Sequence, residues 1–92
     1  MDKLTRAREQ INAIDRQMAE LFERRMSCAE DIASYKMENG LPIFDASREK
    51  NIIQRNASYI KDDIIREYYV NYLQDVMNIS KKYQERLLNG LK

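Results

Sequence analysis

The amino-acid sequence predicts an all-α protein with three helices, the first of which is unusually long. The 92 residues include only two glycines and one proline, so there are few points at which a helix must end. No segment shows the sustained alternation of apolar and polar residues that is typical of a half-buried strand. A chain of this length supports one hydrophobic core, and we expect residues 1–92 to form a single domain.

The first helix is expected to run from about Lys3 to Glu38. Its apolar residues recur three, four and seven positions apart and form one stripe, which consists of Leu4, Ile11, Ile14, Met18, Leu21, Cys28, Ile32 and Tyr35. Gly40 suits the position just after a helix C-terminus, and Pro42 prevents the helix from continuing.

Two shorter helices are expected after this break. Asp45 can cap the second helix, whose inner side carries Ile52, Ile53, Asn56 and Ile60. The acidic pair Asp62-Asp63 can open the third helix. The stripe of the third helix consists of Ile65, Tyr69, Tyr72, Leu73, Val76, Ser80, Tyr83 and Leu87.

The length of the first helix predicts a homodimer. A helix of about 36 residues is roughly 54 Å long. A compact monomer of this size has a radius of gyration of only about 12 Å. The apolar stripe therefore needs a partner over its whole length, which the two shorter helices cannot supply. Pairing of the long helices from two chains is the simplest solution.

Composition excludes several classes of function. A net charge of +1 gives no long-range attraction to a polyanion, so we expect no nucleic-acid partner. The chain has no histidine and a single cysteine, Cys28, which argues against serine–histidine or cysteine–histidine catalysis and against a zinc site. Two separated glycines cannot form a nucleotide-binding loop. We expect neither a metal nor a cofactor.

The sequence also shows no sign of membrane association. No stretch approaches the roughly 18 apolar residues of a membrane span, and the first residues lack the apolar core of a signal peptide. We therefore expect a cytoplasmic protein.

Three cations of the first helix lie on or beside its apolar stripe. On a helical wheel, Arg25 and Lys36 point within roughly 20° of Met18, and Arg8 lies about 80° away at the edge of the stripe. Each one alone is explained by a salt bridge or by an extended side chain that reaches solvent. Together they indicate an anionic partner, because buried like charges without anions are unfavourable.

The other helices add polar groups to the same interior. Glu49 lies among the apolar residues of the second helix with Arg48 at its flank, and Ser80 and Gln84 lie one turn apart on the third. Taken singly, Arg48 and Glu49 could be exposed first-turn residues, and Ser80 could bond back to the carbonyl of Val76. The whole set indicates a pocket for a small anionic molecule between the helices.

If Arg8 belongs to the same pocket, the spacing of the cations also requires a second chain. Arg25 and Lys36 are eleven residues apart, roughly 16 Å, so their long side chains can converge on one small ligand. Arg8 lies seventeen residues from Arg25, roughly 25 Å along the axis. Arg8 can join the pocket only from an antiparallel partner helix, and two symmetry-related pockets would follow.

These polar positions, in this order, closely resemble those of the all-helical chorismate mutases. The resemblance covers essentially the whole chain and is carried by Arg8-Glu9-Gln10-Ile11, Ile14-Asp15, Leu21-Phe22, Arg25, Lys36, Gly40-Leu41-Pro42-Ile43, Asp45, Arg48-Glu49, Ile79-Ser80 and Gln84. It implies the rearrangement of chorismate to prephenate, an isomerase step toward phenylalanine and tyrosine. The reaction needs no cofactor, and its substrate is a dianion.

The resemblance also implies roles for individual residues. Arg8 from the other subunit and Arg25 would bind the substrate carboxylates, a task that suits the guanidinium fork. Ser80 would contact a carboxylate. Lys36 and Gln84 would donate to the ether oxygen, where negative charge grows as its bond to the ring lengthens.

At the other end of the pocket, the resemblance implies that Glu49, helped by the backbone at Asp45, holds the ring hydroxyl. Arg48 would support the site. Cys28 and Phe22 occupy positions where aliphatic residues are usual in this family, which concerns packing rather than chemistry.

Two alternatives stay open from the sequence. An isochorismate-pyruvate lyase of the same fold would use the inward cations on a similar dianion, but that family does not look like the Asp45, Arg48-Glu49 pattern found here. A non-catalytic helical dimerisation or regulatory module would use the inward charges as salt bridges between chains.

Overall fold

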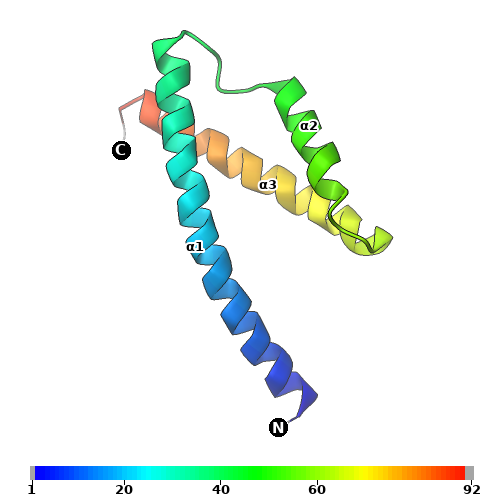
Figure 1. Cartoon of the computed structure of the whole chain (residues 1–92). Helices are drawn as coiled ribbons and strands as arrows, with labels where there is room; N and C mark the ends of the chain where they lie inside the picture. Colours follow the sequence, from blue (N-terminus) through cyan, green and yellow to red (C-terminus); the bar gives the residue numbers. More distant parts are fainter. Residues whose placement is uncertain (1, 91–92) are drawn as a thin grey trace.

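A computed structural model describes residues 2–90 and contains three helices and no strand within that range (Figure 1). Helix α1 spans Lys3–Glu38, α2 spans Ala46–Ala57 and α3 spans Asp63–Leu88. The predicted all-α class is confirmed, and α1 has the bounds that the sequence predicted.

Local chemistry defines both ends of α1. The Asp2 carboxylate accepts a hydrogen bond of 2.7 Å from the backbone N–H of Thr5 and so caps the first turn. At the other end, the N–H of Leu41 donates to the carbonyl of Lys36 at 2.8 Å, and Gly40 has a φ of +65°. Glycine is suited to this left-handed conformation, which ends the helix and turns the chain toward α2.

Aspartate side chains also begin the other two helices, as the sequence predicted. Asp45 accepts from the backbone N–H of Arg48 at 3.0 Å and starts α2. Asp62 accepts from the backbone N–H of Ile65 at 3.0 Å and starts α3. The Asp45 carboxylate thus caps the first turn of α2, the turn that carries Arg48 and Glu49.

Helix α3 packs against both α1 and α2, whereas α1 and α2 do not pack against each other within residues 2–90. The buried apolar side chains are Ala29 and Ala33 of α1 and Leu73 and Met77 of α3. The two alanines let the helices approach closely where α3 crosses the C-terminal half of α1 (Figure 1).

Within one chain, the predicted stripes only partly coincide with the buried residues. Met77 is buried although the predicted stripe of α3 omitted it, whereas Ile65, Tyr72 and Tyr35 are exposed. The reason is that α3 meets α1 through the Ala29 and Ala33 face rather than through the large apolar residues. Ile52, Ile53 and Asn56 are half-buried on α2 as expected. Ile60 is also half-buried, but its predicted place on the second helix was wrong, because α2 ends at Ala57 and Ile60 lies in the loop before α3.

The N-terminal half of α1 projects beyond the other helices (Figure 1). Its large apolar residues are between 43% and 58% exposed, and they are Leu4, Ile11, Ile14, Met18 and Leu21. The radius of gyration is 16.5 Å and the longest dimension is 55 Å, against about 12 Å expected for the radius of gyration of a compact chain. None of the helices in the described part of the chain has a stretch that is long and apolar enough to cross a membrane.

Candidate functional site

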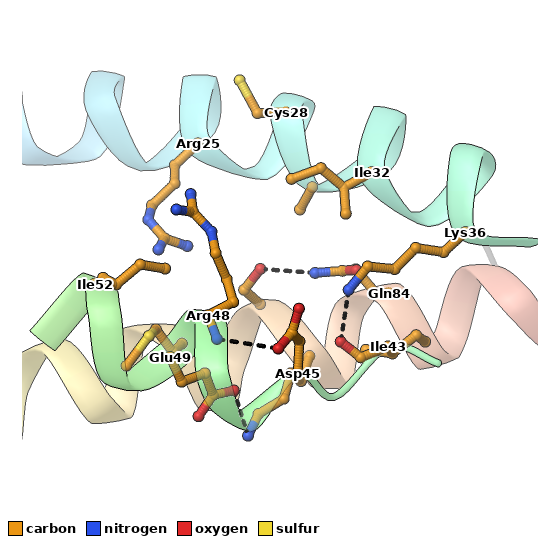
Figure 2. Close-up of a pocket in the computed structure, with 14 residues that line it drawn as sticks. Arg25, Cys28, Ile32, Lys36, Ile43, Asp45, Arg48, Glu49, Ile52 and Gln84 are labelled. Atoms are coloured by element: carbon orange, nitrogen blue, oxygen red, sulfur yellow. Dashed lines mark hydrogen bonds and ion pairs between the residues drawn. The ribbon is translucent and has the colours of Figure 1, made fainter. Parts of the chain in front are cut away.

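A pocket of about 470 Å³ lies between α1 on one side and α2 and α3 on the other (Figure 2). Seven of the eight site residues predicted from the sequence line it, and these are Arg25, Lys36, Asp45, Arg48, Glu49, Ser80 and Gln84. Its volume lies within the range of about 300–1,000 Å³ that is usual for small-molecule sites.

Helix α1 supplies one wall of the pocket. Arg25, Ile32 and Lys36 follow at spacings of seven and four residues, which places them on one face of the helix. The Lys36 ammonium donates a hydrogen bond of 2.8 Å to the carbonyl of Ile43, in the loop before α2. Its Nζ is thereby held at one end of the pocket.

Arg25 and Arg48 are directed toward each other across the pocket, one from α1 and one from α2 (Figure 2). Neither guanidinium group forms an ion pair with any residue between positions 2 and 90. Two facing cations without an anion repel each other, and a carboxylate between them would relieve that repulsion through bidentate hydrogen bonds. This arrangement suits an anionic ligand.

The carboxylate of Glu49 already has two protein partners. Its Oε2 pairs with the ammonium group of Lys81 at 2.9 Å, and its Oε1 accepts from Nε2 of Gln74 at 3.3 Å. The side chains of Glu49 and Lys81 are 16% and 23% exposed. Glu49 is thus fixed to α3 rather than lying free in the first turn of α2.

Ser80 and Gln84 are the buried polar side chains of the described residues, at 7% and 6% exposure. The amide Nε2 of Gln84 lies 3.2 Å from Oγ of Ser80, while its Oε1 is buried without a hydrogen-bond partner. A half-turn of the amide would let the Ser80 hydroxyl donate to Oε1 and would present Nε2 to a bound molecule. Ser80 therefore pairs with Gln84 in this structure, not with Val76.

The lining as a whole is cationic. It includes four cationic side chains, Arg25, Lys36, Arg48 and Lys81, and two carboxylates, Asp45 and Glu49, which leaves a net charge of +2. Lys81 and Glu49 neutralise each other, and Asp45 is used to cap α2. The cations of the lining without an ion pair are therefore Arg25 and Lys36 of α1 and Arg48 of α2.

Arg8 does not line this pocket. It is exposed on the projecting half of α1, near the start of the helix and far from Arg25 along the same helix. The structure of one chain therefore brings together seven of the predicted site residues and leaves out the one that was expected from another subunit.

Lys81 and Met77 also line the pocket, although neither was predicted from the sequence. Met77, Lys81 and Gln84 follow at spacings of four and three residues, so one face of α3 carries all three. Their helical spacing from Gln84 could therefore have identified Met77 and Lys81 as pocket residues from the sequence. Lys81 was hidden because it stands beside Lys82 in a charged segment that looks solvent-exposed.

The two departures from the family pattern lie on the surface of the isolated chain. Cys28 is exposed, and its thiol is directed away from the other labelled side chains (Figure 2). Phe22 is 44% exposed on the same helix. Both are therefore available for contacts outside the chain.

A separate contact outside the pocket joins α1 and α3. The hydroxyl of Tyr83 donates to the carboxylate of Glu30. This hydrogen bond raises the pKa of Tyr83 above its ordinary value of 10.0, and burial makes a smaller contribution in the same direction.

Within residues 2–90, no group of three or more cysteine or acidic side chains is arranged to hold a metal ion.

The chain is similar to proteins of one known family. A family model described as chorismate mutase type II matches residues 7–85. The chain is 32% identical over 89 residues to a chorismate mutase from Methanocaldococcus jannaschii, which covers 96% of this chain and 90% of that protein.

Two further relatives carry related names. A bifunctional chorismate mutase/prephenate dehydratase from Buchnera aphidicola is 31% identical over 89% of this chain and 22% of its own length. A 4-amino-4-deoxychorismate mutase from Streptomyces venezuelae is 29% identical over 83% of this chain and 74% of its own length. No solved structure matches the chain significantly.

Proposed function

Because this chain belongs to the chorismate mutase type II family, we propose that its cationic pocket binds chorismate and promotes its isomerisation to prephenate. The single observation that carries the assignment of the site is the net charge of +2 on the lining, with Arg25 and Arg48 facing each other without an anion. A substrate with two carboxylates supplies the missing negative charge.

The reaction is a rearrangement within one molecule and needs no proton donor, nucleophile, metal or cofactor. The enolpyruvyl arm of chorismate must fold over the ring, so fixing both carboxylates holds the substrate in its reactive conformation. Arg25 and Arg8 of the partner subunit bind the carboxylates in this proposal. Arg48 supports the site opposite Arg25, and Ser80 adds a hydrogen bond.

Stabilisation of the transition state is assigned to Lys36 and Gln84, at the end of the pocket away from Arg25 (Figure 2). As the bond between the ring and the ether oxygen lengthens, negative charge develops on that oxygen. Lys36 donates to it through Nζ, and Gln84 donates through its amide after the half-turn described above. These donors interact more strongly with the transition state than with the substrate, which is what accelerates a reaction. Glu49, beside Asp45, accepts from the ring hydroxyl.

The active form in this proposal is a homodimer in which Arg8 of the partner subunit completes each pocket. The exposed apolar residues along the projecting half of α1 support pairing of the long helices. The exposed position of Arg8 on that same half supports its contribution to a second chain.

The surrounding pathway is inferred from the relatives. The relative from Buchnera aphidicola joins a chorismate mutase to a prephenate dehydratase, an activity that consumes prephenate. We place this chain in the same biosynthesis of aromatic amino acids, in the cytoplasm.

The decisive experiment follows the ultraviolet absorbance of chorismate with the purified chain, while its mass in solution is measured alongside. We expect prephenate to form. Arg25→Ala should lower kcat/KM roughly 100-fold, because a buried charge-assisted hydrogen bond contributes about 3 kcal/mol. The neighbouring Arg24 is exposed, so Arg24→Ala is the matched control and should change kcat/KM less than about threefold.

Other outcomes distinguish the alternatives. Release of pyruvate from isochorismate, without prephenate from chorismate, would identify a lyase. Turnover of neither compound by a folded dimer would leave a non-catalytic helical module as the function.

A further inference from the structure

Lys81 is a cation of the pocket lining that the chemistry described above does not use. It lies on α3, and its ammonium group is 2.9 Å from Oε2 of Glu49 on α2. The same ammonium lies 4.6 Å from the centre of the Phe44 ring, in the loop before α2. Contacts with two separate segments hold this charge beside Glu49, where both side chains are mostly shielded from water.

The pairing changes the electrostatic character of Glu49. An unpaired carboxylate in a pocket attracts a cationic group on a ligand more strongly than a neutral one. With Lys81 at 2.9 Å, the pair has no net charge, and an incoming cation meets a second cation beside the carboxylate. Glu49 can still accept a hydrogen bond from a neutral hydroxyl, since a carboxylate has about four acceptor positions and the protein fills two of them.

We propose that Lys81 is a specificity-determining residue, which makes the Glu49 end of the pocket select a hydroxyl group over an ammonium group on the substrate ring. This inference rests on the proposed function, in which Glu49 meets the ring hydroxyl of chorismate. The two candidate substrates differ at that group: 4-amino-4-deoxychorismate has an amine where chorismate has the hydroxyl, and alkyl amines are protonated at neutral pH.

The test compares kcat/KM for chorismate and for 4-amino-4-deoxychorismate in the wild-type dimer and in four variants. Lys81→Met and Lys81→Gln remove the charge while keeping a side chain of similar length. Both should raise the ratio of amine to hydroxyl turnover at least tenfold. Lys81→Arg keeps the charge, and Lys82→Met alters an exposed lysine next in sequence. These two should leave the ratio within about threefold of wild type.

The ratio separates specificity from a structural role. A loss of packing would lower turnover of both substrates together, so an unchanged ratio in folded Lys81→Met and Lys81→Gln dimers would overturn the inference. The use of two neutral variants guards against one that does not fold, as judged by circular dichroism and elution volume. Wild-type protein that forms no prephenate from chorismate would instead overturn the proposed function, and this inference with it.

Discussion

The ammonium group of Lys36, near the end of α1, donates a hydrogen bond of 2.8 Å to the carbonyl of Ile43 in the loop that leads to α2. An ammonium group has three donors, so two remain for a ligand. Because the helix and the loop hold Lys36 from both sides, its charge is oriented before a substrate binds, which is the condition for effective electrostatic catalysis.

Replacement of Lys36 should be among the most damaging single changes. Lys36→Ala is expected to lower kcat by at least about 100-fold, since removal of one oxyanion donor typically costs about 3 kcal/mol. Lys36→Arg should restore only part of this rate, because a planar fork replaces a compact charge. Steady-state kinetics test both, with the exposed Lys50→Ala as control. Near-normal turnover in a folded Lys36→Ala dimer would remove Lys36 from the reacting centre.

Shared pockets predict complementation between two inactive variants. Arg8→Ala and Arg25→Ala homodimers should each be nearly inactive. After subunit exchange, a mixed dimer contains one pocket with both arginines intact, so part of the wild-type activity should return. Mass spectrometry of the intact dimers measures how much hybrid has formed. Hybrid dimers without activity would show that Arg8 does not complete the partner's pocket.

The pH profile tests the role of Gln84. Wild-type activity should be nearly flat between about pH 5 and 8, because the sequence has no histidine, the side chain that ordinarily titrates there. Glutamate at this position donates only when protonated, and its ionised form repels the charge that develops on the ether oxygen. Gln84→Glu should therefore have activity that falls as pH rises. A flat profile in this variant would place Gln84 outside the reacting centre.

The contact between Tyr83 and Glu30 predicts a loss of stability in alkali. The hydrogen bond to Glu30 raises the pKa of Tyr83 in the folded state above its ordinary value of 10.0. The stabilisation is therefore fully present below about pH 10 and is lost as pH rises through the higher folded pKa. The urea midpoint of wild type should exceed that of Tyr83→Phe at pH 8, and the difference should shrink by pH 11.

The matched control for this prediction is Tyr59→Phe, since Tyr59 is 67% exposed. It should leave the urea midpoint unchanged at both pH values. A constant difference between wild type and Tyr83→Phe from pH 8 to 11 would contradict a role for the Tyr83 proton in the contact.

The helices were predictable because their signals are local. Asp2, Asp45 and Asp62 cap the helices directly, and Gly40 ends α1, so each boundary is determined by residues within one turn of it. Inward-facing polar residues were likewise predictable from helical spacing, since Arg25 and Lys36 share a face whatever packs against it.

The packing partners were less predictable, because contact between helices depends on shape across long separations in sequence. The predicted stripes contained the largest apolar residues, yet α3 approaches α1 where Ala29 and Ala33 leave room. Lys81 was missed for a similar reason. Its partner Glu49 lies 32 positions earlier in the chain, and only the docking of α2 on α3 brings the two together.

The small core of this chain brings folding and catalysis into competition. Six residues between positions 2 and 90 are buried, and two of them, Ser80 and Gln84, are polar and line the pocket. In either orientation of the Gln84 amide, one of its polar atoms has no partner in the chain, and an unsatisfied buried polar atom lowers stability by about 1–3 kcal/mol. Gln84→Met should therefore resist urea better than wild type while losing activity. In the proposed function the same amide donates to the ether oxygen of the substrate, so the group that would be needed for turnover is also one that lowers the stability of the fold.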